Sequence, residues 1–515
     1  MTDVLVVGSG AAGISAALTA AGRGLGVLLV TKDLAGGSTP LAQGGLAAAL
    51  GPGDDPAQHA ADTEIAGAGL CEPDVVAALA AGAPGAIAWL IGLGARLDRV
   101  ALRREGGHHR NRVVHSGNDA TGAEVHRVLL AALRTSPVEV LDKTVALDLV
   151  PGGLLVAGPG GGTRVLTARA VVLAGGGLGQ AYATTSNPPG ATGDAIALAL
   201  RAGAVLQDPE FVQFHPTVLH LPASAPGQRP LITEALRGAG ATLFTHDGSP
   251  LMAGRHPLGD LAPRDVVSAV MAERIEAGDS HLWLDATRLG AEAIEVGFPT
   301  VTAACRAHGI DPVTQPIPVA PGAHYYCGGI RAGLDGRTSL PGLYAVGEAA
   351  STGVQGANRL ASNSITEAVL RGSAAGGAIP PRPPLRTGAC AAPVPLREGI
   401  EPSAALASLA SSEGSGAVSR VAAAEAMSRY GGVVRDADGL RTLLGMLGEI
   451  RGAPNLRAVS ILIATAALAR EESRGCHRRR DFPATAQEPF HTLARWDGAE
   501  LVISKAPIGK SLVTR

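Results

Sequence analysis

The segment REGGHHR, residues 104–110, places one carboxylate, Glu105, among several arginines and histidines. A carboxylate in such a segment can neutralise and orient a cationic group of a small ligand. The two glycines that follow Glu105 predict a backbone that passes close to another part of the protein. The alternative is a solvent-exposed ion pair between Glu105 and a basic neighbour, which is the usual role of a charge-rich segment. The local sequence leaves both interpretations open.

The segment GSGAAG, residues 8–13, has the spacing of a dinucleotide-binding turn. Gly8 allows a tight turn, Gly10 allows the backbone to approach a pyrophosphate, and Gly13 allows a helix to pack closely on a strand. This spacing alone is a weak signal in a glycine-rich chain, and a purely structural turn is the alternative. Its position between an apolar run and a helical pattern strengthens the prediction, because the helix N-terminus then faces the phosphates.

The elements around this turn are those of a β-turn-α-β unit. Residues 3–7 predict a first strand, the pattern up to about residue 22 predicts a helix, and residues 27–30 predict a second buried strand. In dinucleotide-binding folds the second strand usually ends in an acid that holds a ribose. Here it ends in Thr31 and Lys32, so we expect that contact to be made differently.

Two further features favour FAD over NAD as the nucleotide. A second glycine cluster, GGSTPLAQGG at residues 36–45, follows the second strand, and a distant strand within residues 342–348 ends in Gly347 and Glu348. An extended FAD requires segments from distant parts of the chain, whereas a nicotinamide domain usually completes its site locally. For Glu348, the alternative is an ordinary acid at the end of a strand.

The bulk composition excludes several classes of protein. The chain has 515 residues, a net charge of -2 and 46% hydrophobic residues, which predicts two or three domains and no general attraction to nucleic acid or an acidic membrane. Its five cysteines are scattered and lack a CxxC motif, which favours a reducing cytoplasm without disulfides, zinc or other metal sites. The apolar stretch 460–469 is too short to cross a membrane, and the N-terminus runs directly into a strand, so we expect no signal peptide.

The remaining chain alternates between strand and helix patterns. Helices are predicted at about 55–68, 73–93 and 191–204, a strand within 168–177, mixed short elements at 211–325, a linker at 376–400, helices across 401–476, and an irregular tail to residue 515.

Several separate motifs together resemble the flavoprotein family of succinate dehydrogenases, fumarate reductases and L-aspartate oxidases. The motifs are GSGAAG, STPLAQGG, FHPT (214–217), LITEALRGAG (231–240), LAPRDVVSAV (261–270), HYYCGG (324–329), YAVGEAASTGVQGANRLASNS (344–364) and EESRGCHRRRDFP (471–483). The resemblance implies an α/β, Rossmann-like FAD-binding domain in two segments, with an inserted α+β capping domain and a C-terminal helical domain. The expected boundaries are 1–210 and 326–380 for FAD binding, 211–325 for the cap, and 401–515 for the helical domain.

The resemblance also implies the site residues. Those expected to contact FAD are Gly8, Ser9, Gly10, Ala11, Ala12, Gly13, Lys32, Ser38, Thr39, Pro40, Leu41, Ala42, Gln43, Gly44, Gly45, Asp194, Glu348, Ser364 and Ile365. Those expected to act on a C4 dicarboxylate are Glu105, His215, Thr233, Glu234, Arg237, Arg264, His324 and Arg359.

Arg359 can hold a carboxylate in bidentate fashion, while His215, His324 and Thr233 donate to the remaining oxygens. Taken alone, a histidine or threonine of this kind is more often structural. The resemblance places Arg264 at the acid/base position, with a relay through Glu234 and Arg237. A guanidinium holds its proton strongly, so the alternative role of Arg264 is purely electrostatic.

Two positions distinguish members of the family. In the membrane-complex enzymes a histidine attaches covalently to the flavin, and in this chain its position is occupied by Ser38, so we expect non-covalent FAD. The dicarboxylate enzymes tend to have an apolar residue before the Gly-Gly of REGGHHR, whereas the aspartate oxidases resemble this chain. Glu105 would attract the ammonium group of aspartate and disfavour succinate.

The expected reaction is therefore oxidation of L-aspartate to iminoaspartate, with FAD reduced and then reoxidised by O2, giving H2O2, or by fumarate. The resemblance makes this the first step of de novo NAD biosynthesis, and the unstable product suggests a hand-off to quinolinate synthase. Two alternatives remain: a soluble fumarate reductase or succinate-oxidising flavoprotein, and an electron-transfer subunit that docks on an iron–sulfur or membrane partner. The motif residues Arg264 and Arg359 argue against an inactive scaffold.

Overall fold

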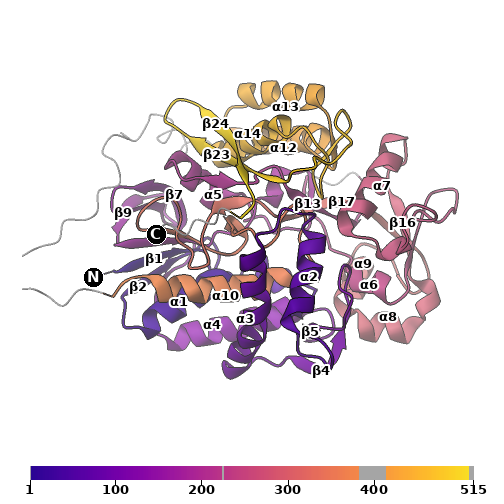
Figure 1. Cartoon of the computed structure of the whole chain (residues 1–515), viewed down its shortest axis with the longest axis horizontal. Coiled ribbons are helices and arrows are strands. Elements are labelled where there is room, and N and C mark those ends of the chain that lie inside the picture. Colours follow the sequence, from indigo (N-terminus) through magenta and orange to yellow (C-terminus); the bar gives the residue numbers. More distant parts are fainter. Residues whose placement is uncertain (1, 223–225, 382–412, 510–515) are drawn as a thin grey trace, which may run out of the picture.

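The computed structural model describes residues 2–222, 226–381 and 413–509, and it contains a five-stranded parallel sheet whose strands β1 (Val4–Val7) and β2 (Val27–Val30) lie at the left of Figure 1. The strand order is β19 (Leu343–Ala345), β10 (Ala170–Leu173), β1, β2 and β6 (Glu139–Leu141). Both faces of such a sheet are covered, so its strands are short apolar runs rather than alternating ones. The carboxyl ends of β1, β10 and β19 meet at one edge, although the strands lie far apart in the sequence.

Helices α1 (Ala11–Gly22), α4 (Thr121–Thr135) and α10 (Asn363–Ala378) cover one face of this sheet. Two glycines of α10 allow it to pack closely on α1. A Cβ at Gly372 would lie 2.3 Å from the Ala12 carbonyl oxygen, and one at Gly376 would lie 2.4 Å from the Ala16 carbonyl oxygen. This packing holds α10, which follows strand β19 in the chain, against the nucleotide-binding turn at the start of α1.

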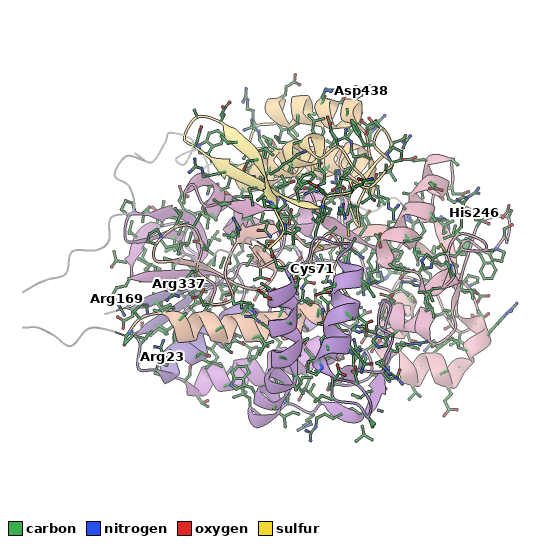
Figure 2. The ribbon with its side chains drawn as sticks, viewed as in Figure 1. Arg23, Cys71, Arg169, His246, Arg337 and Asp438 are labelled. Carbon is green, nitrogen blue, oxygen red and sulfur yellow. The ribbon has the colours of Figure 1, made fainter. Side chains whose placement is uncertain are left out.

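The end of α10 is held by three arginines from separate parts of the chain, which lie at one side of the molecule in Figure 2. Arg23 donates to the carbonyl oxygens of residues 376 and 379, Arg169 to that of residue 380, and Arg337 to that of residue 378. Positively charged donors satisfy the free carbonyls of a helix C-terminus and oppose its negative dipole end.

On the same side of the sheet, α3 (Pro73–Gly92) packs against α2 (Pro56–Ala66) and α10. By length and composition, α3 is the one described helix that is long and apolar enough to cross a membrane. Its apolar residues at positions 75, 76, 79, 83, 87 and 90 are buried inside the protein.

The opposite face is covered by α5 (Asp194–Arg201), by the meander β7 (Val145–Val150), β8 (Gly153–Ala157) and β9 (Thr163–Thr167), and by C-terminal helices. These helices are α12 (Glu413–Tyr430), α13 (Ala437–Glu449) and α14 (Pro454–Ala469), at the top of Figure 1. Buried apolar residues of these elements form one core with the sheet, and the half-buried Leu166 of β9 packs against it.

Residues 212–326 form the part at the right of Figure 1. Its sheet contains β13 (Val212–Leu219), β15 (Thr242–Phe244), β16 (Leu282–Asp285) and β17 (Ile317–Tyr326), joined by the short strands β11 (Thr184–Thr185) and β14 (Gly227–Gln228). Helices α6 (Glu234–Gly238), α7 (Arg264–Glu276), α8 (Ala291–Gly297) and α9 (Pro299–Ala307) belong to the same part. Its buried core is made only of residues between 219 and 319.

Most predicted elements are confirmed, but two predictions are wrong. The tail is not irregular: β23 (Phe490–Trp496) and β24 (Leu501–Pro507) form a hairpin that adds to β12 (Leu206–Gln207), β18 (Gly329–Arg331) and β20 (Ala350–Ser351). The C-terminal region is therefore not purely helical. The hairpin receives its partner strand from residues 206 and 207, a pairing that local patterns do not reveal.

The predicted linker also begins too early, because α10 remains helical to Ala378; residues 382–400 of that linker and 401–412 of the predicted helical region lie outside the described residues. Ala375 and Gly376 are buried, so packing maintains the helix where the composition predicts a linker.

One of the contacts between the nucleotide-binding part and residues 212–326 is a helix cap supplied by Asp119. Asp119 precedes α4 and is 2% exposed, and it accepts hydrogen bonds from the backbone N–H groups of Thr300 (3.1 Å) and Val301 (3.2 Å) at the start of α9. Helix α9 has no side-chain cap of its own. Asp119 therefore caps a helix of a different part of the fold.

We expect the Asp119→Ala substitution to lower the free energy of unfolding by about 1 kcal/mol, as the loss of a helix cap does. Hydrogen exchange of the first turn of α9 should become faster. Asp55→Ala is the matched control, since Asp55 caps α2 within the same part of the fold through Gln58 N. Unchanged exchange in α9 in the Asp119 variant would contradict this role.

Candidate active site

A single cavity of about 290 Å³ opens at the carboxyl ends of β1, β10 and β19. It runs from the turn after β1 to side chains of residues 212–326 and of the segment before α10. All predicted site residues line this cavity except Gly13, Pro40 and Arg237. Segments from several distant parts of the sequence thus meet around one elongated space.

The turn after β1 has the glycine geometry that its sequence predicts. Gly8 has a φ of 111°, and a Cβ there would lie 2.2 Å from the Ala174 carbonyl oxygen. A Cβ at Gly13 would lie 1.9 Å from the Gly8 carbonyl oxygen, so Gly13 serves helix packing rather than cavity lining. Near Gly10, the nearest neighbour of such a Cβ is Thr39 Oγ1 at 3.3 Å, which leaves the backbone open to the cavity.

The end of β2 has a lysine where nucleotide-binding folds usually have an acid. Lys32 forms an ion pair with Asp194 and donates to Thr192 Oγ1 at 2.9 Å. Burial raises the pKa of the Asp194 carboxyl, but the charge of Lys32 and hydrogen bonds from Lys32, Asn455 and Thr192 together lower it overall. Both residues line the cavity, and the ion pair connects the end of β2 to the start of α5.

Glu348 follows β19 and supplies a buried carboxylate at the same edge of the sheet. Its Oε1 accepts a hydrogen bond from Tyr326 N at 2.9 Å, and a Cβ at Gly177 would lie 2.2 Å from that oxygen. Burial raises the pKa of Glu348 to about 7, although the Tyr326 N–H group opposes the shift.

At the other end of the cavity, Arg359 donates a hydrogen bond to the ring of His324. Arg359 Nη2 lies 3.0 Å from His324 Nε2, and its Cζ lies 4.6 Å from the centroid of the Tyr325 ring. Burial and the charge of Arg264 lower the pKa of Arg359 to about 10, so its guanidinium stays charged at neutral pH. Burial lowers the pKa of His215 and His324 well below the usual range, which leaves both rings neutral.

The predicted relay residues are in contact in the predicted order. Arg264 Nε donates to Glu234 Oε2 at 2.7 Å, and Arg237 Nη2 lies 3.6 Å from Glu234 Oε1. Burial raises the pKa of Glu234, but Arg264 and Arg237 outweigh it and lower the pKa overall. Arg237 is buried behind Glu234 and does not reach the cavity.

Glu105 is buried and lines the cavity, so the exposed ion pair considered above is wrong. Its Oε1 lies 3.1 Å from His115 Nε2 and its Oε2 accepts from Ser362 Oγ at 2.5 Å. Burial raises the pKa of Glu105, but His115 and Ser362 outweigh it and lower the pKa to about 2. The glycines after it have the predicted use, because a Cβ at Gly106 would lie 1.7 Å from Glu234 Oε1.

Sequence reasoning missed several residues of this site. Gln213 Oε1 accepts from Arg264 Nη1 (3.2 Å) and from Arg359 Nε (3.3 Å), and Ser186 Oγ lies 2.7 Å from His324 Nδ1. Gln213 stands two positions before the predicted His215, so alternation along a strand was an available signal. His115 and Ser186 had no local signal.

The fold and the cavity are those of a flavoprotein that binds a dinucleotide. Residues 3–365 match the family described as FAD binding domain, and residues 446–513 match the family described as fumarate reductase flavoprotein C-term. An L-aspartate oxidase of Streptomyces coelicolor is 46% identical over 93% of this chain and 88% of its own length. Those of Mycobacterium tuberculosis and Caulobacter vibrioides are 47% and 45% identical, over 95% and 96% of this chain and 94% and 96% of their own lengths. The chain belongs to the L-aspartate oxidase branch of the succinate dehydrogenase and fumarate reductase flavoprotein family.

Solved structures agree with this assignment. A mutant of the E. coli quinol fumarate reductase flavoprotein has a TM-score of 0.86 and 29% identity, and the match covers 100% of this chain and 97% of that chain. A quinol–fumarate reductase with bound menaquinol gives the same TM-score and identity over 99% of both chains.

The raised pKa of Glu348 predicts a pH-dependent stability of the cofactor-free protein. The folded-state pKa of about 7 lies above the ordinary 4.5, so the stabilisation is complete below pH 4.5 and is lost as the pH rises through 7. Between these limits we expect wild type to lose on the order of 3 kcal/mol relative to Glu348→Gln. Urea denaturation at several pH values measures this difference. The exposed Glu449→Gln should keep the wild-type slope, and an equal slope in Glu348→Gln would contradict the assignment.

Proposed function

We propose that this protein is an FAD-dependent L-aspartate oxidase that converts L-aspartate to iminoaspartate. One observation supports this reaction above the others: the cavity holds the buried carboxylate of Glu105 together with the cationic side chains of Arg264 and Arg359. A ligand with two carboxylates and one ammonium group complements that distribution of charge. The FAD-binding family match and the L-aspartate oxidase relatives support the same conclusion.

The residues present fit FAD. The turn from Gly8 to Gly10 presents backbone to the cavity, Glu348 offers acceptors at the edge of the sheet, and the space continues without interruption to Arg359. In this proposal the attachment is non-covalent, because Ser38 lines the cavity at the position where covalent relatives have a histidine. Bound FAD supplies the acceptor for the hydride that leaves the substrate carbon.

The substrate carboxylates are bound by donors from both parts of the fold. Arg359 comes from the segment before α10, while His215, Thr233 and His324 lie in residues 212–326. Neutral imidazoles add no charge, so the net positive charge of the site comes from its arginines. Glu105 binds the substrate ammonium group and orients the substrate carbon that loses the hydride.

Oxidation to the imine also releases a proton from the substrate. Arg264 occupies the acid/base position, and its bond to Glu234 continues to Arg237. In this proposal the relay carries the proton away from the substrate through the contacts between Arg264, Glu234 and Arg237. Arg264 also stabilises the negative charge of the bound dicarboxylate.

The proposal also includes the electron acceptor, the cellular location and the pathway of the enzyme. O2, with H2O2 as product, or fumarate reoxidises the enzyme, which acts in the cytoplasm at the first step of de novo NAD biosynthesis and passes iminoaspartate to quinolinate synthase. The chain divides into an FAD-binding part (1–210 and 326–380), a cap (211–325) and a C-terminal part from 401. The separate core of residues 219–319 supports this division.

A soluble fumarate reductase is the alternative, because the structural relatives include fumarate reductases with the same fold. A buried carboxylate facing a dianion would be unfavourable in such an enzyme, since a ligand without an ammonium group brings no positive charge to Glu105.

We expect L-aspartate to bleach the flavin absorbance of the anaerobic holoenzyme, and succinate to leave it unchanged. The Glu105→Gln variant should bind L-aspartate at least about tenfold more weakly, because a charge-assisted hydrogen bond is lost, while succinate binding is retained or improved. Glu367→Gln is the matched control, since Glu367 is also buried but does not line the cavity. Bleaching by succinate and not by L-aspartate would establish the alternative.

A further inference from the structure

His115 stands directly behind Glu105 and does not itself line the cavity. It is the last residue of β5 (Val113–His115) and is 4% exposed. Each oxygen of the Glu105 carboxylate has one neighbour: His115 Nε2 lies 3.1 Å from Oε1, and Ser362 Oγ donates to Oε2 at 2.5 Å. One lone-pair site remains on each oxygen once one donor is bound, so the carboxylate can still accept from a ligand.

The imidazole of His115 has little freedom to turn. Its Nδ1 lies 3.2 Å from the Val113 carbonyl oxygen, and a Cβ at Gly45 would lie 3.1 Å from its Cε1. Strand β5 is itself paired on both sides, with β3 (Leu46–Ala47) and with β4 (Asp98–Arg103). A ring with a proton on Nε2 donates to Glu105 whether it is the neutral tautomer or the imidazolium.

We propose that His115 is a positioning residue for amine recognition: it holds the Glu105 carboxylate in the orientation that accepts the substrate ammonium group. This inference rests on the proposed oxidation of L-aspartate. Glu105 follows β4 in a loop that contains two glycines, and such a loop does not fix a long side chain by itself. Contacts from β5 and from Ser362 supply the restraint, so less side-chain entropy is lost when the ligand binds.

This arrangement makes the effect of His115 selective. A ligand that carries an ammonium group uses the orientation of Glu105, whereas a dicarboxylate without one does not. Loss of the His115 donor should therefore lower the affinity for L-aspartate and leave the affinity for succinate unchanged. If His115 served folding alone, its loss would weaken the binding of both ligands equally or destabilise the protein. The ratio of the two affinities would then stay the same.

The test compares His115→Leu with His115→Gln in the FAD-loaded full-length protein. For His115→Leu we expect the KM for L-aspartate to rise about tenfold, with kcat within about twofold of wild type and the Kd for succinate unchanged. His115→Gln keeps an N–H donor near the position of Nε2 and should restore most of the KM. Flavin absorbance reports both reduction by L-aspartate and binding of succinate.

The second part of the test is a double-mutant cycle with Glu105→Gln. If His115 acts through Glu105, adding His115→Leu to Glu105→Gln should not change the affinity ratio further. His108→Leu is the matched control, because it also removes a buried imidazole near Glu105, but that ring bonds to the Ala361 carbonyl oxygen at 2.9 Å. It should leave the ratio as in wild type.

Additive effects in the cycle, or equal weakening of L-aspartate and succinate, would overturn the positioning role. Suppose that L-aspartate reduces the wild-type enzyme, but His115→Leu leaves the ratio of the L-aspartate and succinate affinities unchanged. This result would overturn the role of His115 and leave the proposed function standing. A wild-type enzyme that L-aspartate does not reduce would instead overturn the proposed function.

Discussion

The charge of Arg359 is the constraint on which the active site depends. Its guanidinium is buried and remains charged, yet no carboxylate of the described residues lies within 4.0 Å of it. It instead contacts the Gln213 amide oxygen, a neutral histidine, the Ser364 hydroxyl and the Tyr325 ring. Burial of an incompletely neutralised charge is costly, so the site is built for an anion that comes from outside the chain.

Buried arginines elsewhere in the molecule show the contrast. Arg470 pairs with Asp208, Glu210 and Glu472, and Arg112 pairs with Asp54 and Asp62. Those networks connect the C-terminal segment and α2 to the rest of the fold, and their charges are compensated internally. Arg264 lies between the two cases, because it has Glu234 as a partner and still lines the cavity. Arg112, Arg470 and Arg359 are all buried, but only Arg359 has no carboxylate partner among the described residues and lines the cavity.

Local patterns predicted those parts of the structure that local geometry determines. The turn at Gly8, the strands at 4–7 and 27–30 and the helix after them follow from spacing and apolar periodicity. The residues of the dicarboxylate end came from the family resemblance, and the structure brings all but Arg237 to one cavity. What could not be predicted depends on distant partners: the β23–β24 hairpin on residues 206 and 207, and Glu105 on His115 and Ser362. The local sequence identifies Glu105 as an unusual acid among basic residues. Only the burial of its side chain distinguishes a ligand-binding carboxylate from an ion pair on the surface.

The segment from His115 to Asp119 shows how recognition and architecture are combined. His115 contacts the carboxylate that faces the cavity, and Asp119 caps α9 in the part of the fold that supplies Arg264 and Glu234. One short loop thus contacts both Glu105, to which we assign recognition of the ammonium group, and the part that carries the Arg264–Glu234 pair. The Gly106 backbone adds a second contact between the same two parts, since no Cβ would fit beside Glu234 there. These contacts belong to one packed interface between residues 212–326 and the nucleotide-binding part. The packing of these two parts therefore sets the distance between Glu105 and the Arg264–Glu234 pair.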